Sequence, residues 1–281
     1  MKAHYFKIDQ FEVPFRVQVD ELPYFYNKYH YHPQNQLTYI EKGTGTYLIG
    51  NKIGRFAEGD MFVLGSHLPH VFMSDDKYFT DQQLGVRSVN VFFTPDFFSD
   101  KILFIEELSA FKDFISLTKA GLQFNSFSKK EILSDLPQKE GFSRIVCFLE
   151  IIESLIASKN KALAIDVLYK MEEPNPKMEK LYLFTFENFK SKISLSEVAD
   201  LAGYSENAFC KFFKKNTGQT YVNFLNEVRI SHALSLLQDP LKSITDVAYE
   251  SGFQNMSNFN RQFFKKTNIN PKTYQLKLHS L

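Results

Sequence analysis

Residues 30–36 read HYHPQNQ, which places two histidines and several amides close together. On a strand, His30 and His32 point to the same face, because alternate side chains of a strand do so. A third histidine, His70, follows Pro69 near a later strand-like run. Neutral imidazoles bind divalent metals, and imidazoles and amides also form hydrogen bonds to hydroxyl groups. This set therefore indicates either a metal centre or a pocket for a polar ligand.

A second kind of chemistry is repeated in the carboxyl-terminal part of the chain. SLSEVADLAGYSENAFCKFFKK at 194–215 is followed by a similar stretch, SITDVAYESGFQNMSNFNRQFFKK, at 243–266. At about 100° per residue, Asn207, Lys211 and Lys214 point away from the phenylalanines of the first copy. Amides pair with adenine and lysines contact phosphates, so this outer face has the chemistry of DNA recognition.

The outer face of the second copy carries different residues. Ser257, Arg261 and Phe264 lie on it, flanked by Asn258 and Asn260. Arginine pairs with guanine, which contributes about 1–3 kcal/mol of discrimination between bases. Two unequal faces predict that the protein reads an asymmetric site.

Each copy predicts a helix, a tight turn and a second helix. The first helix begins at Ser194 or Ser196, Gly203 supplies the turn, and Ser205 begins the second helix. The matching positions are Val198 with Val247, Ala199 with Ala248, Gly203 with Gly252, Phe209 with Phe259, and Phe213 with Phe263. This is the layout of two helix-turn-helix units, at 194–217 and 243–267. The alternative is two α-hairpins of an ordinary helical domain with solvated charges.

The helix that joins the two copies, at 221–238, is apolar on two sides. One side carries Val222, Leu225, Ala233, Leu236 and Leu237, and the other carries Phe224 and Val228. Such a helix can pack against two subdomains at once. Arg229 projects near the middle of the first stripe, where a cation must be paired or extended to solvent. We expect an ion pair with Asp246 or Glu197.

The amino-terminal part has the pattern of short strands. β-Branched and aromatic runs between turn signals occur from about residue 11 to 93, most clearly at 39–40, 46–49, 60–64 and 89–93. Many short strands at close spacing predict a barrel or sandwich. Helical periodicity follows at 104–118 and 143–158, and the charged, proline-containing segment 170–180 predicts a linker.

Composition fits a globular protein. The chain has 281 residues, of which 44% are hydrophobic and 23% charged, enough for two domains. No secretory signal and no membrane-spanning apolar run is recognisable, and Cys147 and Cys210 form no metal-type pair, so we expect a cytoplasmic protein. Residues 177–281 carry 14 Lys and Arg against 9 Asp and Glu, whereas the remainder carries 19 against 23. The basic part is the candidate for a polyanionic partner.

Residues from about 180 to 278 resemble the DNA-binding domain of the AraC/XylS family of bacterial transcription regulators. The resemblance rests on SLSEVADLAGYS, on the helix NFLNEVRISHALSLL, and on ITDVAYESGF with its NFNRQFFKK continuation and Pro271. It implies two recognition helices in successive major grooves, roughly 34 Å apart on one face of the duplex. The implied partners are double-stranded DNA and, for an activator, RNA polymerase.

The resemblance also implies which residues face the bases. Carried over position by position, they are Asn207, Cys210 and Lys211 in the first unit, and Met256, Ser257, Asn258 and Arg261 in the second. Lys214, and equally Lys211, can contact phosphate. Phe264, Asn268 and Tyr221 depart from the family pattern, since they replace a basic residue, a Gly and a Pro.

The order of motifs near His30 resembles the cupin pattern, His-x-His-x3-Glu, then Gly, then a second motif ending in Pro and His. Cupin enzymes use such histidines and the glutamate to hold a divalent metal. Here Gln36 replaces the glutamate, and an amide is a poorer ligand than a carboxylate for hard cations. We therefore expect no metal, no cofactor and no enzyme activity. The alternative is a metal-dependent cupin enzyme joined to a DNA-binding domain.

Many regulators of this family join a cupin-like barrel that binds a small effector to their DNA-binding domain. The residues expected to line such a pocket are His30, His32, Gln36, Tyr39, Tyr47 and His70. Imidazoles and amides bind hydroxyls and aromatic rings stack on sugar faces, which favours a sugar as effector. The two tyrosines have an alternative role as packing inside the barrel.

These observations predict a multidomain α+β protein that regulates transcription. A cupin-like effector-sensing β-barrel occupies 1–95, a helical connecting and dimerisation region 96–176, and an all-α DNA-binding domain 177–281. In similar regulators a helix after the barrel makes the dimer contact, which points to a homodimer through 143–158. The apolar side of that helix carries Ile145, Phe148, Leu149, Ile152, Leu155 and Ile156. Its alternative role is packing on its own barrel.

Overall fold

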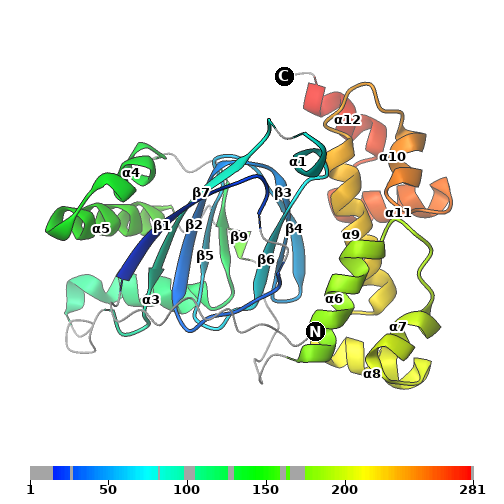
Figure 1. Ribbon diagram of the computed structural model, residues 1–281, viewed down its shortest axis with the longest axis horizontal. Helices are drawn as coiled ribbons and strands as arrows, with labels where there is room; N and C mark the ends of the chain where they lie inside the picture. The colour runs from blue at the N-terminus through cyan, green and yellow to red at the C-terminus, as the bar shows by residue number, and fades with distance from the viewer. Residues whose placement is uncertain are drawn as a thin grey trace. The chain divides into compact units, whose positions relative to one another are not determined.

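The computed structural model describes residues 15–25, 28–81, 83–97, 105–125, 130–158, 163–164 and 175–279. The chain divides into two compact units, His4–Leu168 and Tyr169–Leu281, the latter with Met1–Ala3. In the described residues the first unit combines strands with helices, and the second is helical (Figure 1). Much of the predicted linker at 170–180 lies outside the described residues, and the helices between 105 and 158 belong to the first unit.

The strands of the first unit form two antiparallel sheets. Among the described residues, the larger sheet has the order β1-β7-β2-β5-β8-β9 and the smaller one the order β4-β3-β6. The strands are β1 (Phe15–Leu22), β2 (Asn35–Lys42), β3 (Gly45–Ile49), β4 (Lys52–Phe56), β5 (Met61–Leu64), β6 (His70–Ser74), β7 (Val86–Phe93), β8 (Leu122–Phe124) and β9 (Leu163–Ala164). All four clearest predicted runs fall on strands of these sheets, and the sheet-rich, cupin-like fold is confirmed.

The larger sheet is buried on both faces, and the alternation along β2 separates them. Leu37 and Tyr39 point into a core shared with the helices that follow the strands. Ile40 belongs to a second core between the two sheets, together with Tyr47 of β3. Because side chains alternate along a strand, residues an odd number apart on β2 serve different cores.

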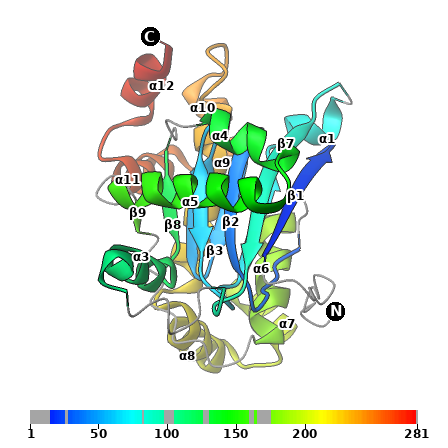
Figure 2. The same ribbon diagram turned by 90° about the vertical axis from the view of Figure 1, so that its left-hand side faces the viewer.

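Helices cover the outer face of the larger sheet. They are α3 (Ser109–Thr118), α4 (Lys130–Asp135) and α5 (Gly141–Ala157), with 3-10 turns at Glu106–Leu108 and Leu136–Gln138, while α1 (Lys77–Thr80) lies between β6 and β7. Figure 2 shows α5 running across the strands. Phe148, Ile152 and Leu155 of α5 are buried in the core with the sheet. Ile156 packs against the same core. Four of the six side chains predicted to form a dimer contact therefore pack within their own unit.

The second unit consists of α6 (Pro176–Asn188), α7 (Leu195–Ala202), α8 (Glu206–Thr217), α9 (Tyr221–Leu236), α10 (Ile244–Glu250), α11 (Met256–Thr267) and α12 (Pro271–His279). Side chains immediately before all seven of these helices accept hydrogen bonds from the first turn, as start signals predict, and before α12 the residue is Asn270. The other six are Asn175, Ser194, Ser205, Thr220, Ser243 and Asn255. Over the described residues, no helix combines the length and apolar character needed to cross a bilayer.

Helix α9 is the element against which both helix-turn-helix units pack, as its two apolar sides predict. Near its start, the ring centroids of Tyr221 and Phe213 of α8 lie 5.3 Å apart. Further along, Ile230 and Ala233 belong to the core of α10 and α11. Val222, predicted to lie in an apolar stripe, is exposed instead.

Arg229 is buried in the middle of α9, but the expected ion pair with Asp246 or Glu197 is wrong. Its Nε donates to the carbonyl oxygen of Phe189 at 2.8 Å, and its Nη2 donates to that of Ser191 at 2.8 Å. These oxygens follow the end of α6, where helix carbonyls lack helical partners and carry partial negative charge. A backbone partner leaves no trace in side-chain spacing, which is why the pattern suggested carboxylates.

Gly252, in the turn of the second helix-turn-helix unit, packs against Phe189 and Arg229. Its φ is +86°, and a Cβ there would lie 2.3 Å from the carbonyl oxygen of Phe189 and 2.9 Å from Nε of Arg229. Both the backbone conformation and the lack of space require glycine. Within the carboxyl-terminal half, the turn of the second helix-turn-helix unit therefore meets the loop between α6 and α7 beside the Arg229 side chain.

We predict that Arg229→Met lowers the free energy of unfolding by about 2–3 kcal/mol, because two buried carbonyls lose a charged donor. The measurement is denaturant unfolding of the full chain, followed by far-UV circular dichroism. Arg261→Met is the matched control, since that side chain is exposed. Equal stability of the two variants would contradict the structural role of Arg229.

Candidate functional site

The first helix-turn-helix unit presents polar side chains on α8 while its phenylalanines face inward. Gly203, with φ 72°, makes the left-handed turn between α7 and α8, and Glu197 completes a capping box with Ser194. Phe209 and Phe213 are fully buried. The four residues of this unit that were predicted to contact DNA are all exposed: Asn207, Cys210, Lys211 and Lys214.

The second helix-turn-helix unit repeats this arrangement with a different set of side chains on α11. Ser257 and Arg261 are exposed, while Met256 and Asn258 are half-buried. Nη2 of Arg261 donates to Oδ1 of Asn258 at 2.9 Å. The backbone N–H of Asn258 donates in turn to Oδ1 of Asn255 at 2.8 Å, which fixes the start of the helix. The two predicted base readers, Asn258 and Arg261, therefore form a linked pair.

Phe264 differs from the other aromatic residues of α11. It is 56% exposed, although Phe263 is fully buried. It borders an open hollow together with Met256 and Arg261. The outward position predicted for this residue is confirmed, and a position that commonly carries a cation in the family carries an apolar ring here.

In the amino-terminal half of the chain, backbone pairing brings the three predicted histidines together. The N–H of His30 donates to the carbonyl of His70 at 3.0 Å, and the N–H of His70 donates to that of His30 at 2.8 Å. The ring centroids of His30 and His70 lie 4.4 Å apart, and those of His32 and His70 lie 5.3 Å apart. One ring nitrogen from each of the three lies within 4.8 Å of the others. We call this set the histidine cluster.

Gln36 connects the histidine cluster to a chain of polar side chains in the barrel. Nε2 of His32 lies 2.8 Å from Oε1 of Gln36, whose Nε2 donates to Oγ1 of Thr38 at 2.7 Å. Thr38 donates to Oδ1 of Asn90 at 2.8 Å, and Nδ2 of Asn90 donates to Asp20 at 2.9 Å. A continuous line of hydrogen-bonding groups therefore runs from Asp20 to the cluster.

Sequence reasoning missed Thr38 and Asn90 as members of this line. Both are almost fully buried, at 3% exposure each. The available signal was the alternation of polar with apolar residues on β2 and β7, which places the polar residues of each strand on one face. That alternation was hidden because both faces of the sheet are buried and the runs read as generally apolar.

Burial keeps the histidine cluster neutral near pH 7. It lowers the pKa of His32 to about 4, and it holds the pKa of His70 well below 6.5. The pKa of His30 is also lowered by burial. Neutral imidazoles have an unprotonated ring nitrogen that can accept a hydrogen bond or bind a metal.

Neither tyrosine predicted for the effector pocket joins the histidine cluster. Tyr39 lies three residues from Gln36 and therefore on the opposite face of β2, in the core with the helices. Tyr47 does face the space between the sheets, but its hydroxyl donates to Oε1 of Gln123 at 2.9 Å. Burial raises the pKa of Tyr47 to about 12. Both rings belong to hydrophobic cores of this unit, Tyr39 to the core with the helices and Tyr47 to the core between the sheets.

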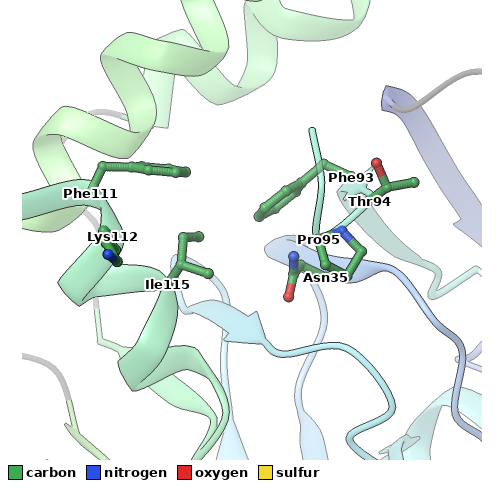
Figure 3. A pocket seen from close by; sticks show the side chains of 7 residues that line it. All are labelled: Asn35, Phe93, Thr94, Pro95, Phe111, Lys112 and Ile115. Carbon is green, nitrogen blue, oxygen red and sulfur yellow. The ribbon is translucent and has the colours of Figure 1, made fainter. Parts of the chain in front are cut away.

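A separate small pocket lies between the end of β7 and α3 (Figure 3). Its walls combine apolar rings with a few polar groups. They are Asn35, Phe93, Thr94, Pro95, Phe111, Lys112 and Ile115. The six residues expected to contact an effector are not among them, so the histidine cluster and this pocket are distinct features of the first unit.

Family models match both units of the chain. Residues 13–91 match the AraC-like ligand binding domain, and residues 198–277 match a helix-turn-helix domain. The first match covers the strands that hold the histidine cluster. The second begins in α7 and ends in α12, and so includes both helix-turn-helix units.

Similar proteins include HTH-type transcriptional regulators. YdeC of Bacillus subtilis, an uncharacterised regulator, is 23% identical over 255 residues, which cover 88% of this chain and 85% of YdeC. The regulator SAS0078 of Staphylococcus aureus, also uncharacterised, is 36% identical over 88 residues, which cover 31% of this chain and 12% of that protein.

Among solved structures, ToxT from Vibrio cholerae O395 aligns with 95% of this chain and 100% of its own at 17% identity, with a TM-score of 0.37. An AraC-type regulator from Chromobacterium violaceum aligns with 37% of this chain and 93% of its own at 24% identity, with a TM-score of 0.34. The two matched domains, in this order along one chain, place the protein in the AraC family of transcriptional regulators.

Proposed function

We propose that the protein is a sequence-specific, one-component regulator whose amino-terminal barrel responds to a small molecule. The observation that carries the DNA-reading part is the pair of capped helix-turn-helix units packed against α9. Each helix-turn-helix unit buries two matching phenylalanines, Phe209 and Phe213 in the first and Phe259 and Phe263 in the second, and exposes polar side chains on its recognition helix. Such an arrangement presents two recognition helices from one rigid support.

The two recognition helices are proposed to read different half-sites. On α8, Asn207 offers an amide for adenine, and Lys211 offers a cation for guanine or phosphate. On α11, the Arg261 guanidinium has the geometry for guanine, and Asn258 lies beside it. The preferred duplex would therefore carry two unlike half-sites in successive major grooves.

The effector is proposed to contact the first unit near the histidine cluster. His30 is only partly buried, so this cluster has a solvent-facing side. Imidazole and amide groups suit a ligand with several hydroxyls, and a sugar is the class that they favour. Binding there would bias an equilibrium between states that position the DNA-binding domain differently.

The protein is proposed to form a homodimer through the outer side of α5. Phe142, Val146 and Leu149 are 82%, 37% and 41% exposed, respectively. They lie four and three residues apart, which places them on one side of a helix. This side differs from the one that packs on the sheet, so α5 can serve both its own core and a partner.

Our first test of DNA reading is Arg261→Ala, with Lys214→Ala as the comparison. Arg261→Ala should reduce discrimination between the preferred duplex and one in which the guanine read by Arg261 is replaced by another base. The expected reduction is about 1–3 kcal/mol. Lys214→Ala should weaken binding to all duplexes and reduce the salt slope by about one. The preferred duplex comes from selection on random DNA, and binding is measured by fluorescence anisotropy. The assignment fails if both variants lose affinity equally on every duplex.

The effector proposal predicts that a sugar or related polyol raises the melting temperature of the full chain. A ligand that binds only the folded state stabilises by about 2.7 kcal/mol at a concentration 100 times its dissociation constant. The readout is a thermal-shift screen, repeated with His30→Ala. A stabilising sugar whose effect survives this substitution would place the effector elsewhere in the barrel.

The dimer proposal predicts that Val146→Glu with Leu149→Arg converts a dimer into a monomer at micromolar concentration. Buried charges would oppose association where apolar contacts now favour it. Sedimentation equilibrium measures the mass of the full chain. Leu117→Arg on α3 is the control, because Leu117 is also exposed, at 48%. A monomeric wild type, or a double variant that remains dimeric, rules this interface out.

A further inference from the structure

Each ring of the histidine cluster is oriented by a backbone carbonyl. Nδ1 of His30 lies 2.8 Å from the oxygen of Lys28, and Nδ1 of His70 lies 2.8 Å from that of Leu68. Nδ1 of His32 lies 3.0 Å from the oxygen of Gln34. A carbonyl can only accept, so these contacts favour a proton on Nδ1 and leave the lone pair on Nε2.

One of these Nε2 atoms, that of His70, lies in surroundings short of donors. Nε2 of His70 is buried and has no hydrogen-bond partner among the residues that the structure describes. A buried acceptor without a donor is costly, and native structures fill such positions with water, ions or side chains. The three rings place one ligand atom each within 4.8 Å of one another.

His32 cannot satisfy both of its contacts as a neutral ring. Its Nδ1 faces the backbone oxygen of Gln34, and its Nε2 faces Oε1 of Gln36. A neutral imidazole has one N–H, so the lone pair of the other nitrogen faces a lone pair of an oxygen, which is repulsive. Protonation of the second nitrogen would remove the conflict, but burial lowers the pKa of this ring to about 4.

Rotation of the Gln36 amide does not remove the conflict either. As placed, its Nε2 donates to Thr38 and lies 3.4 Å from Oδ1 of Asn90, which also accepts from the Thr38 hydroxyl. A rotated amide would point an oxygen at Thr38 and Asn90, where one hydroxyl proton would have to serve two acceptors. The neighbours of Gln36 thus favour an oxygen that faces His32.

We infer that the histidine cluster is a binding site for one divalent transition-metal ion. Nε2 of His30, His32 and His70 would be three ligands, and Oε1 of Gln36 would be a fourth. A cation at this point supplies what the surroundings lack: a partner for Nε2 of His70, and a positive charge between Nε2 of His32 and the amide oxygen. The carbonyls that hold the Nδ1 atoms act as the outer contacts that commonly orient metal-binding histidines.

The donor set selects the kind of metal. Three neutral imidazoles suit ions such as Zn²⁺, Co²⁺ or Ni²⁺, whereas Mg²⁺ and Ca²⁺ prefer carboxylate oxygens and water. Glutamine in place of a carboxylate lowers the affinity for hard cations but leaves imidazole coordination intact. The glutamine that argued from sequence against a metal therefore narrows the choice of metal.

The inference concerns the barrel alone and does not rest on DNA binding. A bound ion would tie the segment around His30 to β6, and any open coordination position would accept an oxygen of an effector. Failure of the metal site would leave the helix-turn-helix proposal untouched, and failure of DNA binding would leave the metal site untouched.

The experiment titrates the chelator-treated full chain with Co²⁺, followed by visible absorption, and with Zn²⁺, followed by calorimetry. We expect one ion per chain and a higher melting temperature of the loaded form. His30→Ala and His70→Gln should each weaken binding at least about 100-fold, since ligand loss exceeds the 10–100-fold effect of outer contacts. Mg²⁺ at the same concentration should not compete.

His67→Asn is the matched control, because His67 is exposed near the cluster, and asparagine tolerates its φ of 60°. Its affinity should equal that of the wild type. Gln36→Glu should strengthen binding, since a carboxylate is the better ligand. Far-UV circular dichroism verifies the fold of each variant, and His30→Ala, at a partly exposed position, carries the test if His70→Gln does not fold. Binding that is absent in the wild type, or unchanged in folded His30→Ala, overturns the inference.

Discussion

The contact between Arg229 and the carbonyls of Phe189 and Ser191 is the interaction on which the carboxyl-terminal unit depends. The guanidinium extends from α9, which supports both helix-turn-helix units, and holds the chain between α6 and α7. Gly252 closes the turn of the second unit against the same atoms. The buried Arg229 side chain thus contacts both the carbonyls after the end of α6 and the tight turn of the second helix-turn-helix unit. Its cost of desolvation is offset by two hydrogen bonds to oxygens that would otherwise lack donors.

The barrel solves a different problem, because its larger sheet must serve two cores. The outer face is apolar and packs on α3 and α5, while part of the inner face is polar. The polar line from Asp20 through Asn90 and Thr38 to Gln36 is buried at its Gln36 end and half-buried at its Asp20 end. A buried line of this kind is stable only where its members satisfy one another. At the histidine cluster that rule is not met among the described residues, because Nε2 of His70 lacks a hydrogen-bond partner, and an external partner fits there.

Much of this architecture could be predicted from the sequence. The repeated valine, glycine and phenylalanine positions specified both helix-turn-helix units, and the capping residues matched the start signals closely. Two kinds of error remained. Arg229 forms hydrogen bonds with backbone oxygens, which the spacing of residue types cannot indicate. Tyr39 was grouped with Gln36, although strand alternation places the two on opposite faces of β2. The polar line was missed because its members are spread over β1, β2 and β7, which meet only after the sheet has formed. Spacing reports local geometry well, and partners across strands poorly.

The hydrogen bond from Arg261 to Asn258 has a consequence for how the second recognition helix meets DNA. A free arginine side chain on a helix samples many rotamers and loses roughly 2 kcal/mol of entropy when it is fixed. Here part of that ordering has already occurred in the unbound protein, since the guanidinium is held by a neighbour one turn away. Recognition would then begin from a narrow set of conformations, so that a mismatched base is met by a group with little freedom to adapt to it.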